Sequence, residues 1–366
     1  MHLKSFTFSL ITAAIFISNA AIANSPAIVT HQAADSASIV AYWTPERMQA
    51  AEPMDLPQID HSRVKHLSIE ELKSQFKDAP FETEGSLPTI EMQPNMKQIF
   101  QPKISVKAKP LDAGTLQEQF TSAQLTPTTA VTSYPYRAVG KLFFTTPSGN
   151  KTCSAAVIGP RIVLAAGHCV HSGTSTGWYS NWMFVPAYNN GAAPYLTWTA
   201  SYVSTLGTWA NGGGTVPNAG DWSMLEIADQ AVNGTTTKIQ GVVGSLGFLT
   251  QSTIPNHATI LGYPGAFDSG QYMHQVLAQS AQAVAPNNAE YGSDMGLGAG
   301  GGPWIQNFGS ASVGQTGGTN PTRSRVVGVT SYGYNDTTSL GNGSAIFDNT
   351  FVSLYNFICA HQTGNC

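Results

Sequence analysis

The feature that most constrains the fold is a series of short strand-like runs after about residue 130. Apolar and β-branched residues recur at 137–145, 155–164, 183–186, 257–261 and 325–330. Clusters of Gly, Pro, Asn and Ser separate these runs at short intervals, where a βαβ unit would need a helix between strands. The pattern therefore predicts an all-β domain, either a sandwich or a barrel.

One helix is expected near the end of the chain. Phe351, Leu354, Tyr355 and Ile358 fall at positions i, i+3, i+4 and i+7, which gives a helix one apolar face. The spacing predicts an amphipathic helix over 350–361.

The composition changes sharply near residue 130. Of the charged residues, 23 precede residue 131 and 15 follow it, whereas 34 of the 36 glycines follow it. We expect a polar, partly ordered pro-segment at 24–130 and the all-β domain at 131–366; a retained N-terminal extension is the alternative. Two helix starts are predicted in the earlier segment, at Thr44-Pro45 and at the capping box Ser68–Glu71.

The first residues have the form of an export signal. Lys4 supplies positive charge, 6–17 is mostly apolar, and Ala21-Ile22-Ala23 has the small-x-small form of a cleavage site. A membrane anchor is the alternative, but the apolar run is short for a span of about 20 residues. We therefore expect a signal peptide at 1–23 and a secreted protein that is not in the membrane once mature.

Charge and cysteine content narrow the function further. Charged residues make up only 10% of the chain, with a net charge of -4, so no basic patch for nucleic acid is expected. Export makes disulfides plausible, and four cysteines allow three pairings. A zinc site is the competing interpretation, but the chain has no C-x-x-C pair. The four cysteines are Cys153, Cys169, Cys359 and Cys366.

The most informative motif is Val163–Val170, where an apolar strand leads into Ala-Ala-Gly-His-Cys. It resembles the A-A-H-C context of the catalytic histidine in trypsin-like serine peptidases, with Gly167 as an inserted residue. The resemblance implies that His168 is the catalytic base. His171 could suggest a metal pair with His168, but no third ligand is evident nearby.

By the same resemblance, an aspartate that opens an apolar strand should orient His168. Asp221 opens the run 221–227 and is our candidate, although the following Trp222 departs from the family pattern. Asp229 is the alternative, but it follows the strand. The turn Leu261–Gly265 (LGYPG) resembles one in the glutamyl-endopeptidase branch of the superfamily.

The loop that should carry the nucleophile reads Gly298-Ala-Gly-Gly-Gly-Pro303. The family pattern is G-x-S-G-G-P, so Gly300 stands where the serine is expected. No small shift recovers a serine, because Ser293 is too early and Ser310 is too late. A phosphate-binding loop would need a following Lys-Ser/Thr, which is missing. The resemblance gives the backbone N–H groups of Gly298 and Gly300 to the oxyanion hole.

The run Ser331-Tyr332-Gly333 resembles the S-W-G strand that pairs with the substrate backbone. Asp294 lies six residues before Gly300, where an aspartate at the base of the primary pocket selects Arg or Lys in trypsin-like enzymes. A solvent-facing loop aspartate is the alternative. Thr330 replaces the histidine usual in the glutamyl branch, so glutamate specificity is not expected.

The resemblance implies two antiparallel six-stranded barrels, at about 131–236 and 237–348. It implies no metal or organic cofactor, a peptide or protein ligand, and we expect a monomer. Two functions stay open, because glycine cannot form an acyl-enzyme. One is an inactive homologue that binds peptides or partners; the other is an active endopeptidase in which the loop is atypical. A histidine-dependent hydrolase that uses water directly is a weaker third.

Overall fold

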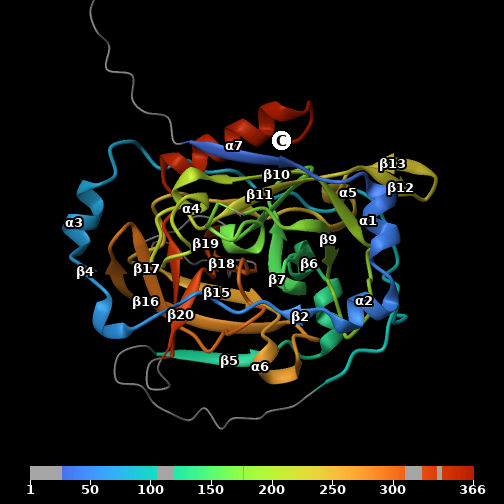
Figure 1. Cartoon of the computed structure of the whole chain (residues 1–366), viewed down its shortest axis with the longest axis horizontal. Helices are drawn as coiled ribbons and strands as arrows, with labels where there is room; N and C mark the ends of the chain where they lie inside the picture. The colour runs from blue at the N-terminus through green and yellow to red at the C-terminus, as the bar shows by residue number, and fades with distance from the viewer. Residues whose placement is uncertain (1–26, 105–118, 176, 310–323, 336–339) are drawn as a thin grey trace, which may run out of the picture.

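The described residues form two β-sheet units with short helices around them and one longer helix at the C-terminal end (Figure 1). The expected signal peptide, 1–23, lies outside the described residues, as does the alternative serine Ser310. A computed structural model describes these parts of the chain: 27–104, 119–175, 177–309, 324–335 and 340–366.

The first sheet contains a closed barrel of six antiparallel strands. The order β10-β11-β8-β7-β6-β9 returns to β10, because Trp198 and Thr199 pair with Phe184 and Met183. Closure removes the free strand edges of the sheet. The strands are β6 (Val139–Thr146), β7 (Gly149–Val157), β8 (Ile162–Ala165), β9 (Ser180–Pro186), β10 (Trp198–Leu206) and β11 (Ser223–Ile227). A hairpin of β12 (Gln230–Val232) and β13 (Thr235–Thr237) follows.

The second sheet is barrel-like. Its order β14-β19-β18-β15-β16-β17-β21-β20 is antiparallel apart from the β14–β19 pair. Among the described residues no strand ladder joins β19 to β21, but the Val329 N–H donates to Ser344 Oγ across that gap (2.9 Å). The strands are β14 (Gly247–Phe248), β15 (His257–Gly262), β16 (His274–Val284), β17 (Asn288–Gly292), β18 (Pro303–Gln306), β19 (Arg325–Val329), β20 (Tyr332–Tyr334) and β21 (Gly341–Ala345).

The two predicted helix starts in the earlier segment are confirmed. Thr44 caps α2, and Ser68 with Glu71 forms a capping box on α3. The C-terminal helix α7 begins one residue before the predicted 350, with Asp348 accepting from the N–H groups of Thr350 and Phe351. The helices are α1 (Ser36–Tyr42), α2 (Pro45–Ala50), α3 (Ile69–Ser74), α4 (Gly207–Ala210), α5 (Ile239–Val243), α6 (Gly265–Asp268) and α7 (Asn349–His361).

The described part of the earlier segment lies on both sheets. Trp43 is buried and packs edge-on against Phe143 of β6, with ring centroids 5.5 Å apart. Trp43 thus covers part of β6, which is buried along nearly its whole length. The segment's strands are β1 (Ile28–Gln32) on β10, β2 (Glu52–Pro53) on β7, β3 (Gln58–Ile59) on β20, and β4 (His66–Leu67) and β5 (Phe120–Gln124) on β16.

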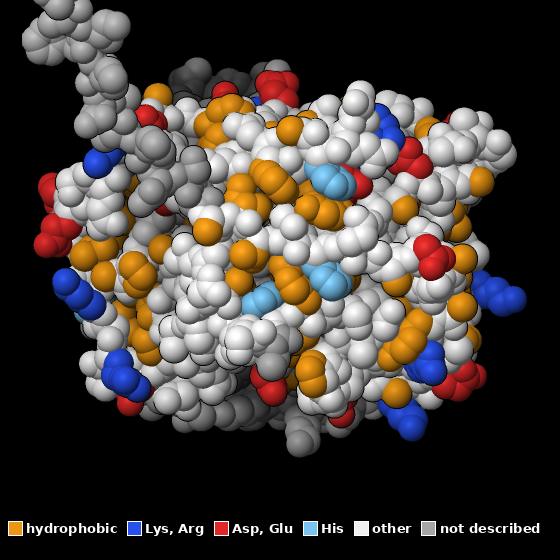
Figure 2. All heavy atoms as spheres, turned by 45° about the horizontal axis from the view of Figure 1, so that its top comes forward, with side chains coloured by type: hydrophobic (Ala, Val, Ile, Leu, Met, Phe, Trp, Pro, Cys, Tyr) orange, Lys and Arg blue, Asp and Glu red, His pale blue; other side chains and the backbone are white. Residues whose placement is uncertain are grey.

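The surface offers no helix of the length and apolarity that a membrane crossing requires, within the part of the chain that the structure describes. On the face drawn in Figure 2, charged side chains lie mainly around the rim. Small groups of apolar side chains lie between them.

Candidate active site

His168 lies in a short 3-10 turn, Gly167–Cys169, that follows β8. The inserted Gly167 has a steric reason. A Cβ at this position would lie 2.7 Å from Trp209 Cδ1 and 3.0 Å from Asp221 Oδ1. Trp209 in turn packs edge-on against the His168 ring, with centroids 6.2 Å apart. Glycine therefore lets both Asp221 and Trp209 approach the histidine closely.

A disulfide joins this turn to the neighbouring strand β7. Of the three pairings that the sequence allowed, the structure has Cys153–Cys169 and Cys359–Cys366. The first bond ties the residue after His168 to β7, and the second closes the C-terminus onto α7. Both pairs are therefore the ones closest in sequence.

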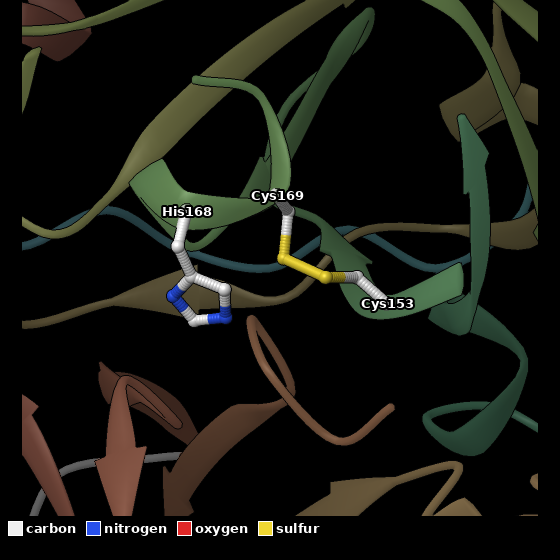
Figure 3. A group of neighbouring side chains, drawn as sticks. All are labelled: Cys153, His168 and Cys169. Atoms are coloured by element: carbon white, nitrogen blue, oxygen red, sulfur yellow. A yellow bond between two sulfur atoms is a disulfide. The ribbon is translucent and has the colours of Figure 1, made fainter. Parts of the chain in front are cut away.

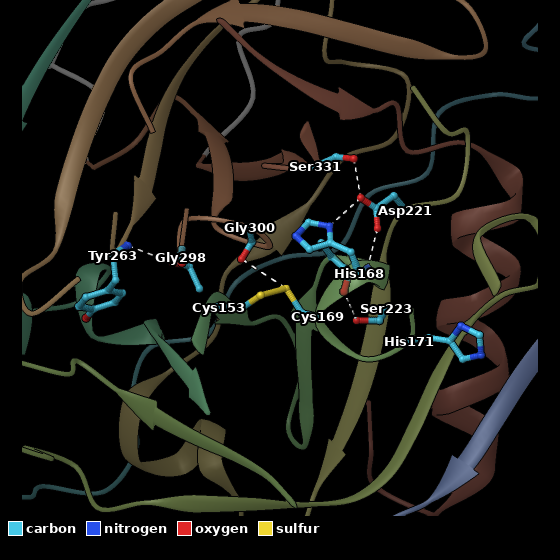
Figure 4. Close-up of a disulfide and its surroundings, with 12 residues drawn as sticks. Cys153, His168, Cys169, His171, Asp221, Ser223, Tyr263, Gly298, Gly300 and Ser331 are labelled. Carbon is cyan, nitrogen blue, oxygen red and sulfur yellow. Dashed lines mark hydrogen bonds and ion pairs between the residues drawn. A yellow bond between two sulfur atoms is a disulfide. The ribbon is translucent and has the colours of Figure 1, made fainter. Parts of the chain in front are cut away.

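Figure 3 shows Cys153, His168 and Cys169 close together, and their ligand atoms lie within 4.8 Å of one another. The two sulfurs are bonded to each other at 2.04 Å, so neither is a thiolate. Because the thiolate is the form that binds metal, this group does not fit a metal ion. His171 points away from His168 in Figure 4, and its Nδ1 accepts from the Gly173 N–H.

Asp221 is fully buried and accepts three hydrogen bonds (Figure 4). Its Oδ1 accepts from the His168 backbone N–H (2.8 Å) and its Oδ2 from His168 Nδ1 (2.9 Å). The Ser331 hydroxyl donates to the same Oδ2 at 2.5 Å. The alternative, Asp229, instead accepts two hydrogen bonds from Arg161, each at 2.6 Å. Asp221 is therefore the carboxylate that orients His168.

Gly300 faces the other nitrogen of the histidine. A Cβ at position 300 would lie 2.2 Å from His168 Nε2 and 3.0 Å from Cε1. Among the described residues, Nε2 is buried and has no hydrogen-bond partner. The imidazole ring thus occupies the volume that a side chain at position 300 would need.

The loop around Gly300 is held from β7. The Ser154 N–H donates to the Gly300 carbonyl (2.8 Å), and the Ser154 hydroxyl donates to the Gly298 carbonyl (2.9 Å). The same hydroxyl accepts from the Tyr263 N–H at 3.0 Å. Gly298 has φ of +82°, a conformation that favours glycine. The loop is therefore anchored although it is rich in glycine.

The chain is similar to two known bacterial proteases over part of its length. No protein-family model matches the chain. Over 150 residues, which are 40% of this chain and 42% of the relative, it is 29% identical to a glutamyl endopeptidase of Bacillus licheniformis. The chain thus spans about two fifths of the length of the curated relatives that it matches.

Two solved structures are similar over about two thirds of the chain. The protease Anisep from Arthrobacter nicotinovorans is 28% identical, with a TM-score of 0.52, over 66% of this chain and 100% of that one. The chain has the fold of the trypsin-like serine proteases. A thermostable serine protease, AL20, from an extremophilic microorganism supports the fold alone, at 24% identity and a TM-score of 0.51, over 62% of this chain and 98% of that one.

Within this trypsin-like fold, Tyr332 and Gly333 of the run 331–333 lie in β20, and Ser331 directly precedes it. The pairing of this run with a substrate backbone stays a prediction. Ser331 holds Asp221, and the buried Tyr332 hydroxyl donates to Glu290 at 2.7 Å. The Gly333 N–H donates to the carbonyl of Pro57. Besides its pairing with β21, Gly333 of this run therefore contacts a second extended segment, β3, which belongs to the chain itself.

Asp294 lies half-buried beside Ser122 of β5. Burial raises the pKa of its carboxyl, and a hydrogen bond from Ser122 and the nearby His274 oppose that rise. Its Oδ1 is buried and has no hydrogen-bond partner among the described residues. Its role at the base of a primary pocket stays a prediction.

Sequence reasoning missed two residues of the site. The Ser154 hydroxyl donates a hydrogen bond to the glycine loop, and Trp209 packs edge-on against the His168 ring. Neither residue stands in a recognisable motif. The one hint in the sequence was the inserted Gly167, because a glycine there leaves room for a neighbouring side chain, which is Trp209. Trp222, which departed from the family pattern, is buried against Phe347 and Phe351 at the start of α7.

Proposed function

We propose that this protein is an inactive or strongly impaired homologue of secreted serine endopeptidases, which binds a peptide or a protein partner at the old site. One observation carries the proposal. Position 300 has no side chain, and the His168 ring fills the volume that one would need, since a Cβ there would lie 2.2 Å from Nε2.

The chemistry of acyl transfer explains why this matters. The step needs a hydroxyl beside the base, which takes its proton as the acyl-enzyme forms. Loss of the nucleophile costs about a millionfold in kcat in a serine protease of unrelated fold that uses the same chemistry, and roughly 10³–10⁴-fold catalysis over water remains there. His168 and Asp221 keep their geometry, but His168 has no proton to take from residue 300.

Several further predictions belong to this proposal. A secreted protein fits the two disulfides, because such bonds persist outside the cytosol. We also propose a signal peptide at 1–23, a pro-segment at 24–130 and a monomeric domain at 131–366. Selection of basic residues by Asp294 is a weaker proposal, since its carboxyl contacts Ser122 and lies near His274.

The test is labelling of the full chain with a fluorophosphonate probe, together with casein turnover. We expect wild type to give no more signal than a matched His168→Ala variant. Labelling or turnover of wild type that His168→Ala abolishes would overturn the proposal.

A serine at position 300 tests the rest of the apparatus. We expect Gly300→Ser to be labelled slowly, in a reaction that depends on His168. Labelling should be slow because the His168 ring has to move away from the new Cβ. Leu56 Cδ2 lies 3.3 Å from where a Cβ of residue 300 would be, so the variant is also tested in combination with Leu56→Ala. No labelling of either form would mean that other parts of the site also fail to support acyl transfer.

A further inference from the structure

Residues 52–59 of the chain cross the site from one sheet to the other. Figure 1 shows this segment, in blue, running across the middle of the view. At its start β2 lies parallel to β7, with a 2.6 Å ion pair between Glu52 and Lys151. At its end β3 lies parallel to β20. The segment therefore bridges the two strands that flank the histidine and the glycine loop.

The carbonyl of Met54 lies on the glycine loop. It accepts from the Gly298 N–H at 2.7 Å, while the Met54 N–H donates to the Thr152 carbonyl at 2.8 Å. The Gly298 N–H is one of the two donors that the trypsin-like resemblance gives to the oxyanion hole. A carbonyl of the chain itself thus already takes up this donor.

The side chains of the segment fill the space around the loop. Leu56 is only 7% exposed, and its Cδ2 lies 3.3 Å from where a Cβ of residue 300 would be. Its Cδ1 lies 3.9 Å from the corresponding position at Gly333. Pro53 packs where a Cβ of Gly298 would be, at 2.9 Å. Another peptide could not reach Gly300 while Leu56 is in place.

The direction of the segment is opposite to that of a peptide poised for cleavage. The Gly333 N–H donates to the Pro57 carbonyl (3.0 Å) and the Asn335 N–H to the Ile59 carbonyl (3.2 Å). The chain therefore passes Gly298 first and follows β20 afterwards. A peptide with its scissile carbonyl at Gly298 and the preceding residues along β20 would have to run the other way.

We infer that residues 52–59 are the resident peptide ligand of this site and exclude other peptides from it in the full chain. The inference rests on the proposed function only in treating the site as one that binds peptides. Because the segment is tethered, a competing peptide faces an effective concentration on the order of millimolar. The site becomes available when the segment leaves.

Hydrogen exchange of the full chain tests whether the segment is in place. We expect the amides of Gly298 and Gly333 to be protected in wild type and to exchange roughly 30-fold faster or more in Leu56→Asp, since a buried leucine is lost. Leu87→Asp is the matched control, because Leu87 lies in the same N-terminal region and is 67% exposed. Leu56→Ala, which adds no charge, is measured in parallel in case Leu56→Asp does not fold.

Binding in trans tests exclusion directly. A fluorescent peptide with the sequence of residues 52–59 should bind the Leu56 variants at least about tenfold more tightly than wild type, by anisotropy. The same peptide with Asp in place of its Leu should bind neither. Rapid exchange of both amides in wild type, or equal peptide binding by wild type and the variants, would overturn the inference. Fluorophosphonate labelling of wild type would overturn only the proposed function and leave both of these results standing.

Discussion

The two halves of the site differ in how complete they are. On the first barrel, Asp221 accepts hydrogen bonds from both the backbone N–H and the Nδ1 of His168. On the second sheet, the loop at 298–302 keeps its backbone anchors but has no side chain at Gly300. The first half therefore has a histidine held by a carboxylate, and the second half has an anchored loop with no side chain at position 300.

The difference shows that the histidine side does not depend on a nucleophile. Asp221 receives its third hydrogen bond from Ser331, and none of the three donors comes from the glycine loop. A buried carboxylate with three donors is satisfied by its own surroundings. Of the ring nitrogens of His168 and the carboxylate oxygens of Asp221, only Nε2 has no partner among the described residues, and that atom faces Gly300.

We expect the largest loss of stability from a substitution on the histidine side of the site. Asp221→Ala leaves three buried donors unpaired and should lower the free energy of unfolding by about 3–5 kcal/mol. Urea unfolding measures this loss. Glu91→Ala, at an exposed carboxylate, is the control and should change the free energy by about 0.5 kcal/mol or less. A loss near that of the control would mean that the Asp221 network is not formed in solution.

Besides Asp221, Lys141 of β6 is a second buried ionisable residue. Its Nζ donates to the Gly270 carbonyl (2.8 Å), and burial lowers the pKa of the amine to about 7. The unfolded chain holds this proton up to its ordinary pKa near 10.5, so stability should rise with pH above 7. Between pH 7 and 9 the gain should be about 2 kcal/mol relative to Lys141→Met.

Urea unfolding of wild type and Lys141→Met at pH 7, 8 and 9 measures this gain. Lys97→Met, at an exposed lysine, should keep the wild-type slope. Parallel pH profiles for wild type and Lys141→Met would contradict the prediction.

The steric relation between the halves can be tested at Gly300 itself. Gly300→Ala should cost about 1–3 kcal/mol, because its Cβ meets Nε2. In a His168→Ala background most of that cost should disappear, which gives a coupling of about 1–2 kcal/mol. Gly296→Ala in the same loop is the control, since a Cβ there meets no atom within 4 Å. Equal costs of Gly300→Ala in both backgrounds would show that the ring does not occupy this space.

The all-β class and the main motifs could be predicted from the sequence for local reasons. The runs that became β6 to β8 and the context of His168 are carried by neighbouring residues, and the C-terminal helix by its spacing. The closed first barrel follows from the resemblance, whereas the second sheet is closed only in part.

The role of residues 52–59 could not be predicted in this way. Strands β2 and β3 are two residues each, which is too short to show a period of two. Their position depends on pairing with β7 and β20, far along the chain. Likewise, nothing local to Ser331 indicates that its hydroxyl reaches Asp221.

The smallest expected effects compare the serines that support each half. Ser154→Ala removes the partner of both the Gly298 carbonyl and the Tyr263 N–H, and should cost about 2 kcal/mol. Ser223→Ala removes one donor, to the Ala166 carbonyl on the histidine side (2.9 Å), and should cost about 1 kcal/mol. Urea unfolding ranks the two, and hydrogen exchange at Gly298 should rise only in Ser154→Ala. The reverse ranking would mean that the loop is held mainly by its backbone bonds, with the Ser154 hydroxyl contributing little.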